Sequence, residues 1–367
     1  MTTTMLAARA RKGSDALHLD EIDTPEPGPQ DVLVKVASAG LAPGMMTLLA
    51  QGAFTHLPTT LGHEAAGTVV ATGDEAGTVA VGTRVRVHPS LNCRACAYCR
   101  SDRDMMCPQQ ALIGHAAFSD GPLPLYERYH DGGLAEYIRV PHWLVDPLPD
   151  NVSFDVGAKV HDLANAVRAL KLADLPLGST LVVTAATGTM GTATITLARH
   201  FGVARLILVG RSAERLRAVS RLAGGVATDL VALEELPATW AEDGGLTRAL
   251  RRLAPRGADA VLDFIPEGPA TSQALAALTT GGALVHMGAN PSPLTLPTAA
   301  IMVNCWRVIG ARACTRTDAQ QVLTLLARNA LRADELITHR YPLTEAAEAV
   351  AALRSRTEPL WMVVVNP

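Results

Sequence analysis

Residues Leu181–Gly191 read LVVTAATGTMG, and the domain organisation of the rest of the chain can be inferred by starting from this stretch. Its first four residues are apolar or β-branched, as in a buried strand, and glycines at 188 and 191 follow in a tight turn. The helix that begins there continues to Phe201 with small and apolar residues near one face. A second apolar strand, Leu206–Val209, completes a β-α-β unit.

A turn of this kind leaves free N–H groups at a helix N-terminus, where they and the helix dipole can hold a pyrophosphate. The usual fingerprint is G-x-G-x-x-G, and this chain has alanine in the first position. The pattern is informative here because it stands between a strand and a helix. We predict that the dinucleotide is bound by Ala186, Thr187, Gly188, Thr189, Met190 and Gly191, and by Met287 and Gly288 where the nicotinamide ring would lie.

The two halves of the chain show different patterns. Residues 5–150 contain short alternating strands separated by glycines, which is typical of a small barrel-like domain. After residue 180, apolar strands alternate with helices, which predicts a parallel, doubly wound sheet. The predicted fold class is therefore α/β, with a β-rich domain and a doubly wound domain.

Composition narrows the classes of function. The chain has 367 residues, a formal net charge of -3 and no long basic run, so we expect neither nucleic acid nor a membrane surface as partner. The first residues lack the charged start and apolar run of a signal peptide, and no apolar stretch is long enough to span a bilayer. We expect a cytoplasmic protein that binds a small-molecule substrate.

Four of the six cysteines fall within fifteen residues, with the spacing C-x₂-C-x₂-C-x₇-C. Four thiolates so close together can surround one tetrahedral ion, and a closed four-sulfur shell leaves no open position for substrate. We predict one structural zinc per chain in a lobe at about residues 90–110, held by Cys93, Cys96, Cys99 and Cys107. An iron–sulfur cluster or reactive thiols are the alternatives.

The residues after the second strand bear on the choice of dinucleotide. NAD-binding units usually place a carboxylate there to hold the ribose 2′-hydroxyl, but this chain has Gly210, Arg211 and Ser212. Arg211 can pair with a 2′-phosphate, Ser212 can donate a hydrogen bond, and Arg215 lies one turn further on. We therefore predict NADP(H), unless Arg211 is only a solvated surface charge.

Three further residues are candidates for the chemistry. His63 stands beside Glu64 in the segment Gly62–Gly67, and His161 stands beside Asp162 in a predicted helix. His63, His161 and Asp162 could hold a metal or move a proton. Each could equally be an ordinary packed residue or a helix-surface pair.

These features resemble the zinc-containing medium-chain dehydrogenase/reductase superfamily, of the alcohol dehydrogenase type, over essentially the whole chain. The resemblance rests on the Gly62–Gly67 segment, the four-cysteine lobe, the glycine turn and Tyr341–Leu343. It implies a GroES-like catalytic domain over residues 1–160, a Rossmann domain over 161–310 and a C-terminal segment, 311–367, that returns to the first domain. It also implies a homodimer or homotetramer, commonly built by joining Rossmann sheets edge to edge.

The catalytic metal site departs from this family. Zinc alcohol dehydrogenases resemble one another in a G-x-C-x-[ST]-D segment, whose cysteine ligates zinc. Here the matching positions hold Ala42, Gly44 and Met45, and the last ligand aligns with His161 or Asp162. We therefore expect no catalytic zinc. Residues 39–43 also look like the matching segment of zinc-independent quinone or enone reductases.

Three functions remain open from the sequence. The first is an NADPH-dependent reductase that transfers hydride to an activated C=C, C=N or carbonyl group. The second is a zinc-dependent alcohol dehydrogenase with an atypical metal site made of His63, His161 and a carboxylate. The third is a non-catalytic NADPH-binding protein.

Overall fold

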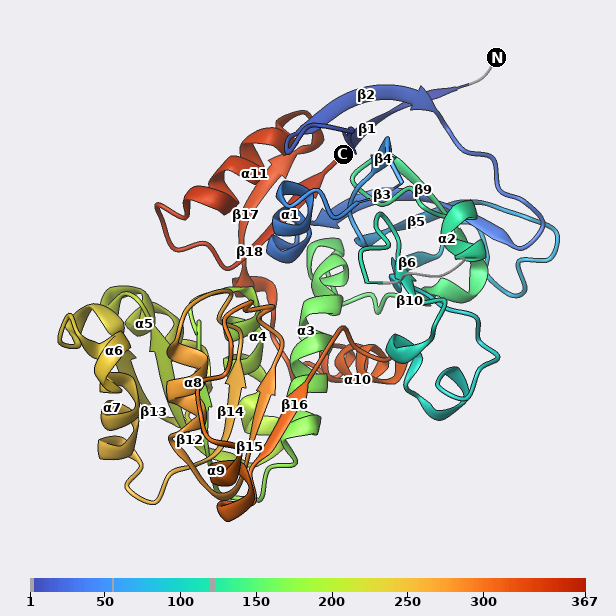
Figure 1. Cartoon of the computed structure of the whole chain (residues 1–367). Coiled ribbons are helices and arrows are strands. Elements are labelled where there is room, and N and C mark those ends of the chain that lie inside the picture. The colour runs from blue at the N-terminus through green and yellow to red at the C-terminus, as the bar shows by residue number, and fades with distance from the viewer. Residues whose placement is uncertain (1–2, 55, 119–122) are drawn as a thin grey trace. The chain divides into compact units, whose positions relative to one another are not determined.

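The computed structural model describes residues 3–54, 56–118 and 123–367, and it divides the chain into two compact units (Figure 1). Unit 1 contains the chain up to His161 together with Thr315–Pro367, and unit 2 contains Asp162–Cys314. The long helix α3 (Phe154–Ala173) includes the boundary between them. No helix among the described residues is long and apolar enough to cross a membrane.

Unit 1 is built mainly on a seven-stranded sheet. Its strands run in the order β10-β6-β5-β3-β18-β17, and β9 also pairs with β3. These strands are β3 (Asp31–Gly40), β5 (Glu64–Thr72), β6 (Arg84–Val87), β9 (Tyr137–Pro141), β10 (Val145–Pro147), β17 (Ile337–Pro342) and β18 (Met362–Asn366). The smaller sheets contain β1 (Thr4–Ala10), β2 (Leu17–Asp23) and β4 (Thr59–Thr60), and β7 (Ser90–Leu91) with β8 (Ala111–Leu112).

The C-terminal segment completes this sheet. Strand β18 pairs antiparallel with β3 and parallel with β17, so residues more than 300 positions apart in the chain lie side by side (Figure 1). Alternating valines of β3 and β18 point into one apolar core, which explains why these strands are so rich in Val. The helices of unit 1 are α1 (Pro43–Ala50), α2 (Pro124–Arg128), α10 (Arg316–Ala327) and α11 (Ala346–Ser355).

Unit 2 contains a six-stranded parallel sheet in the order β13-β12-β11-β14-β15-β16. This is the doubly wound arrangement expected from the alternating sequence pattern, and the strand order reverses between β11 and β14. The strands are β11 (Ser179–Val183), β12 (Val203–Gly210), β13 (Ala227–Ala232), β14 (Ala258–Asp263), β15 (Leu278–His286) and β16 (Arg307–Gly310). The helices are α4 (Thr189–Leu197), α5 (Ala213–Ser220), α6 (Trp240–Asp243), α7 (Gly245–Leu253), α8 (Ala270–Leu275) and α9 (Thr298–Val303).

The central strands β11, β12 and β14 are mostly buried on both faces, as their continuous apolar runs indicate. On one face Val182, Ile207 and Val261 belong to the same buried cluster as Leu246 of α7 and Leu275 of α8. Strand β16 is an edge strand, because β15 is its only partner among the described residues. The rigid sheet places the ends of β11, β12, β14 and β15 where ligand-binding turns can follow.

Candidate functional site

The dinucleotide turn of unit 2 has the geometry that its sequence predicts. Strand β11 ends at Val183, and Gly188 is the N-cap of α4. A Cβ atom added to Gly191 would lie 2.5 Å from the carbonyl oxygen of Ala186, so only glycine lets the helix pass this close to the turn. The N-terminus of a helix such as α4 favours an anion, through its backbone N–H groups and the helix dipole.

A buried carboxylate fixes the neighbouring strand ends. Asp263, at the end of β14, accepts hydrogen bonds from Thr184 Oγ1 at 2.5 Å and Thr271 Oγ1 at 2.9 Å, and its Oδ2 lies 2.6 Å from His286 Nδ1. Asp263 is fully buried. Met287 donates its N–H to the Asp263 carbonyl. The network therefore ties the start of the dinucleotide turn to the predicted Met287–Gly288 segment.

Gly288 allows a second close backbone approach. A Cβ atom at this position would lie 2.2 Å from the carbonyl oxygen of Ile265, in the segment that follows β14. The predicted cofactor-binding residues directly follow β11 and β15. Only β14 separates these two strands in the sheet, so both sets of residues lie at the same sheet edge. This is the edge at which doubly wound folds bind their cofactors.

The end of β12 carries the residues predicted to select the dinucleotide. Arg211 is exposed, and Ser212 and Arg215 are half-buried. Ser212 is the N-cap of α5, but the first helix N–H, from Ala213, donates to Glu234 Oε1 at 2.8 Å instead of to a serine hydroxyl. The N–H of Glu234 in turn donates to the Arg211 carbonyl.

Glu234 was missed by the sequence analysis, which considered only the residues that directly follow β12. It lies just after β13, and the parallel pairing of β12 with β13 brings it to the same sheet edge. A carboxylate therefore does lie beside the predicted 2′-phosphate position. The Arg211 cation and the Glu234 anion have opposite effects on a phosphate there.

The four cysteines of unit 1 lie close together, as the predicted metal centre requires. Their sulfur atoms all lie within 4.8 Å of one another. Cys99 Sγ lies 3.9 Å from Cys93 Sγ and 3.6 Å from Cys96 Sγ, and four sulfurs around a tetrahedral zinc at their usual bond length lie about 3.8 Å apart. The donor set therefore fits a closed zinc site, with Cys107 as the fourth ligand.

Backbone groups favour thiolates in this lobe. The N–H of Cys96 points at Cys93 Sγ, and the N–H groups of Cys93 and Gln109 point at Cys107 Sγ. Hydrogen bonds from backbone N–H groups lower the pKa of Cys93 to about 6. Burial raises the pKa of Cys99 and Cys107, so a cation is needed to hold all four cysteines as thiolates at once.

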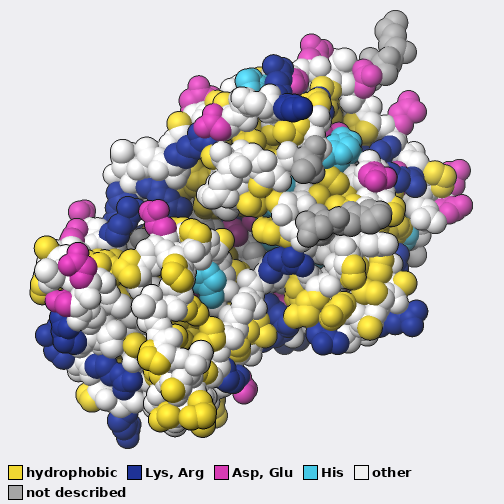
Figure 2. Space-filling model, in the orientation of Figure 1, with side chains coloured by type: hydrophobic (Ala, Val, Ile, Leu, Met, Phe, Trp, Pro, Cys, Tyr) yellow, Lys and Arg dark blue, Asp and Glu magenta, His cyan; other side chains and the backbone are white. Residues whose placement is uncertain are grey.

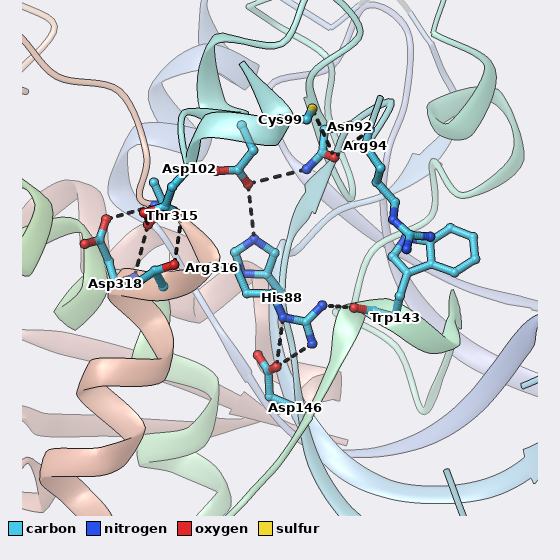
Figure 3. Close-up of polar contacts among 12 residues, drawn as sticks. His88, Asn92, Arg94, Cys99, Asp102, Trp143, Asp146, Thr315, Arg316 and Asp318 are labelled. Carbon is cyan, nitrogen blue, oxygen red and sulfur yellow. Dashed lines mark hydrogen bonds and ion pairs between the residues drawn. The ribbon is translucent and has the colours of Figure 1, made fainter. Parts of the chain in front are cut away.

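Polar side chains connect this lobe to the sheet and to α10 (Figure 3). Asn92 accepts from Cys99 Sγ and donates to Asp104, and Asp102 accepts from Thr317. Deeper in, two arginines donate to the buried carboxylate of Asp146. Arg86 Nη2 lies 2.9 Å from Asp146 Oδ2, and Arg316 Nη2 lies 2.5 Å from Asp146 Oδ1. The lobe is thus attached to the rest of unit 1 through specific polar contacts.

The predicted catalytic histidines are brought together. His63 precedes β5 and His161 lies on α3, and their ring centroids are 5.1 Å apart. Both are buried, and burial holds the pKa of His161 well below its usual value. Asp162 is also buried, but as the next residue of a helix it points about 100° away from His161.

His115 joins this cluster, and the sequence analysis did not identify it. Its ring centroid lies 5.5 Å from that of His63, and its ring stacks on that of Phe54 with the centroids 5.3 Å apart. Burial lowers the pKa of His115 to about 3, so its imidazole is neutral near pH 7. Nothing in its local sequence, Gly114-His115-Ala116, signals such a position.

The histidine cluster does not form a metal site like the one that the resemblance implies. Ala42 replaces the thiolate ligand, and Glu64 Oε2 lies 2.6 Å from the ammonium of Lys159. Among the residues that the structure describes, only the four cysteines bring three or more His, Cys, Asp or Glu ligand atoms within 4.8 Å of one another. The donor set in the lobe therefore suits a metal, and no donor set of that size lies beside His63 among the described residues.

Comparison with known proteins agrees with this architecture. Residues 28–150 match the family model of the alcohol dehydrogenase GroES-like domain, and residues 189–328 match that of zinc-binding dehydrogenases. The chain is 27% identical to sorbitol dehydrogenase of Bombyx mori over 94% of both chains. It is 28% identical to D-arabitol-phosphate dehydrogenase of Enterococcus avium, over 97% of this chain and 96% of the other.

A solved structure gives the same result. A protein from Sinorhizobium meliloti 1021, described as a zinc-binding dehydrogenase and bound to NADP, superposes with a TM-score of 0.82. It is 27% identical to this chain, and the match covers all of both chains. The similarity therefore extends over both units.

Proposed function

Because the chain belongs to the medium-chain dehydrogenase/reductase superfamily, as a zinc-type alcohol dehydrogenase-like oxidoreductase, we propose that it reduces an electron-poor C=C, C=N or carbonyl bond of a small molecule with NADPH. We propose further that no metal ion takes part in the chemical step. The observation that carries this proposal is the Lys159–Glu64 ion pair where a metal-binding carboxylate is expected.

Each unit has a separate role in this proposal. In unit 2 the turn Ala186–Gly191 binds the pyrophosphate, and Met287–Gly288 bounds the nicotinamide position. When bound, NADPH supplies the hydride, and the substrate takes up the electron pair on a heteroatom or α-carbon together with one proton. Without a metal to neutralise that charge, the acceptor bond must already be electron-poor or receive its proton from a side chain.

His63 is the group that we assign to the proton. His115 and His161 are neutral near pH 7 because burial lowers their pKa, so neither carries a readily released second ring proton. His63 has a carboxylate close by, with its Nε2 3.8 Å from Glu64 Oε1. A nearby anion favours the protonated form of an imidazole, so we assign to His63 the role of carrying the proton.

A substrate panel tests this function. We expect NADPH consumption with at least one conjugated enone, imine or activated carbonyl compound, followed by the absorbance of the reduced nicotinamide. His63→Gln should lower kcat by about 10²–10⁴-fold, the usual contribution of a general acid. His18→Gln, at a half-buried position of β2, is the matched control and should leave kcat unchanged. If His63→Gln is as active as the parent protein, the proton assignment is wrong.

The polyol dehydrogenases among the relatives and the zinc-binding dehydrogenase family model favour a second candidate, a zinc-dependent alcohol or polyol dehydrogenase. It requires oxidation of a polyol with NADP⁺ that a chelator abolishes and added zinc restores. If such zinc-dependent oxidation of a polyol is found, the metal-free proposal is wrong and this second function takes its place. A non-catalytic NADPH-binding protein is disfavoured by the dehydrogenase relatives, and it would consume no NADPH with any acceptor.

We also propose that unit 2 joins two copies of the chain through its exposed edge. Met302 and Val303 of α9 are 72% and 68% exposed, and Val308 of β16 is 40% exposed. Figure 2 shows hydrophobic side chains gathered over this end of unit 2. An unpaired edge strand beside exposed apolar residues is a ready site for sheet extension.

Charges on this edge should separate the copies. We expect Met302→Lys/Val308→Lys to be monomeric at a concentration where the parent protein is a dimer or tetramer, as measured by light scattering after gel filtration. Val81→Lys, which changes a valine of unit 1 that is 62% exposed, should leave the assembly intact. An unchanged mass for the double variant would place the interface elsewhere.

A further inference from the structure

One lysine of this chain has an unusual position. The chain contains only four lysines, Lys12, Lys35, Lys159 and Lys171. The other three are exposed or half-buried, but the side chain of Lys159 is 1% exposed. Burying an ammonium is costly unless it is paired, so a paired lysine in the core needs a physical explanation.

Lys159 is paired with the carboxylate of the metal-site motif. Its Nζ lies 2.6 Å from Glu64 Oε2, and the Glu64 side chain is fully buried. Gly40, which pairs with Glu64 across β3 and β5, makes room for this contact. A Cβ atom at Gly40 would lie 2.0 Å from Glu64 Oε2 and 2.9 Å from Lys159 Cδ. Strands β3 and β5 and helix α3 therefore pack closely around this one ion pair.

The pair also acts on the adjacent histidines. The second oxygen of Glu64 lies 3.8 Å from His63 Nε2, and Lys159 stands two residues before His161 on α3. Burial is the main cause of the low pKa of His161, and the nearby charges of His63, His88, Arg86 and Lys159 lower that pKa further. A divalent cation placed beside His161 would meet the same repulsion.

We propose that Lys159 is a positioning residue that takes the place of a metal ion: its ammonium holds the Glu64 carboxylate and keeps divalent cations from binding beside His63 and His161. The fixed ammonium supplies positive charge in this region without occupying a coordination position. Glu64, held on one side by Lys159, keeps its other oxygen toward His63. This inference deepens the proposed function, because it gives a physical reason for chemistry without a metal.

Metal content tests the role of Lys159 without any turnover. Ala42→Cys restores a thiolate at the position where the family resemblance places one. After equilibration with buffered zinc and gel filtration, we expect the parent protein and Ala42→Cys to retain one zinc per chain, both in the cysteine lobe. Ala42→Cys/Lys159→Gln should retain two, because the amide keeps a hydrogen bond to Glu64 but no longer offsets its charge. Ala42→Cys/Lys35→Gln is the matched control and should retain one.

Two results would overturn the proposal. One is a second zinc in the parent protein or in Ala42→Cys, since Lys159 would then not exclude metal. The other is a folded Ala42→Cys/Lys159→Gln protein that stays at one zinc. If this variant folds only when zinc exceeds one equivalent, the proposal is supported. If it stays unfolded at every zinc concentration, Lys159 has a structural role only and the proposal fails. The zinc count does not depend on activity, so a protein that reduces no acceptor can still give the expected zinc counts. The proposal for Lys159 and the proposed reductase function can therefore fail independently.

Discussion

Replacing Cys93 by serine is expected to empty the cysteine lobe of zinc and to lower the free energy of unfolding by on the order of 5 kcal/mol. The loss is large because the lobe has almost no apolar core: no residue from Cys93 to Asp104 is buried. Structural zinc contributes about 10–16 kcal/mol to small domains that fold around it, and a site with three thiolates keeps only part of that. We therefore expect a bound zinc ion to be the main contact that orders the lobe.

The effect should extend beyond the lobe itself. Asp102 accepts from Thr317, and Thr315 is the N-cap of α10 in a capping box with Asp318. When residues 93–107 lose their order, we expect the start of α10 to lose these contacts as well. Limited proteolysis should then cut within 93–107, at sites that the parent protein protects.

Zinc content per chain and the midpoint of chemical unfolding measure this prediction. Cys305→Ser is the control, because Cys305 is an exposed cysteine outside the cluster. It should keep one zinc and the parent midpoint. A Cys93→Ser protein that retains one zinc and unfolds like the parent would mean that the lobe does not depend on a four-thiolate site.

The fold was largely predictable because its signals are local. The apolar run of β11 and the glycines at 188 and 191 determine a strand, a turn and a helix within a dozen residues. The cysteine spacing likewise places four ligands on one short loop. The elements α1 and β16 were not predicted, because they are short and carry no clear periodicity. Local patterns determine such elements poorly, since tertiary packing stabilises them.

The candidate site was less predictable because its decisive contacts join distant residues. The Lys159–Glu64 pair spans 95 positions, and nothing in the local sequence of either residue reveals the other. His115 reaches His63 from a different loop, with a ring distance of 5.5 Å that only the fold determines. The missing thiolate at Ala42 was visible in the sequence, but the cation that compensates for it was not. Substitutions at a degenerate site thus have to be interpreted with their spatial neighbours.

Replacing Arg211 by alanine is expected to weaken NADPH binding by about 10–100-fold and to change NADH binding little. A hydrogen bond to a charged partner is worth about 1.5–3 kcal/mol, and each 1.4 kcal/mol is a factor of ten in affinity. NADH has no 2′-phosphate, so it loses no such contact. Fluorescence titration of both reduced cofactors with the two proteins gives the ratio directly.

Replacing Glu234, at the same sheet edge, should change the preference for NADPH over NADH in the opposite direction. Its carboxylate accepts the Ala213 N–H at 2.8 Å and adds a negative charge beside the predicted phosphate position. Glu234→Gln keeps an oxygen for that N–H and removes the charge, so NADPH should bind more tightly while NADH binding stays level or weakens. The two substitutions should therefore move the NADPH-to-NADH affinity ratio in opposite directions. Equal losses for both cofactors in Arg211→Ala would show that this arginine is a solvated surface charge, and the assignment of NADP(H) would then have to rest on other residues.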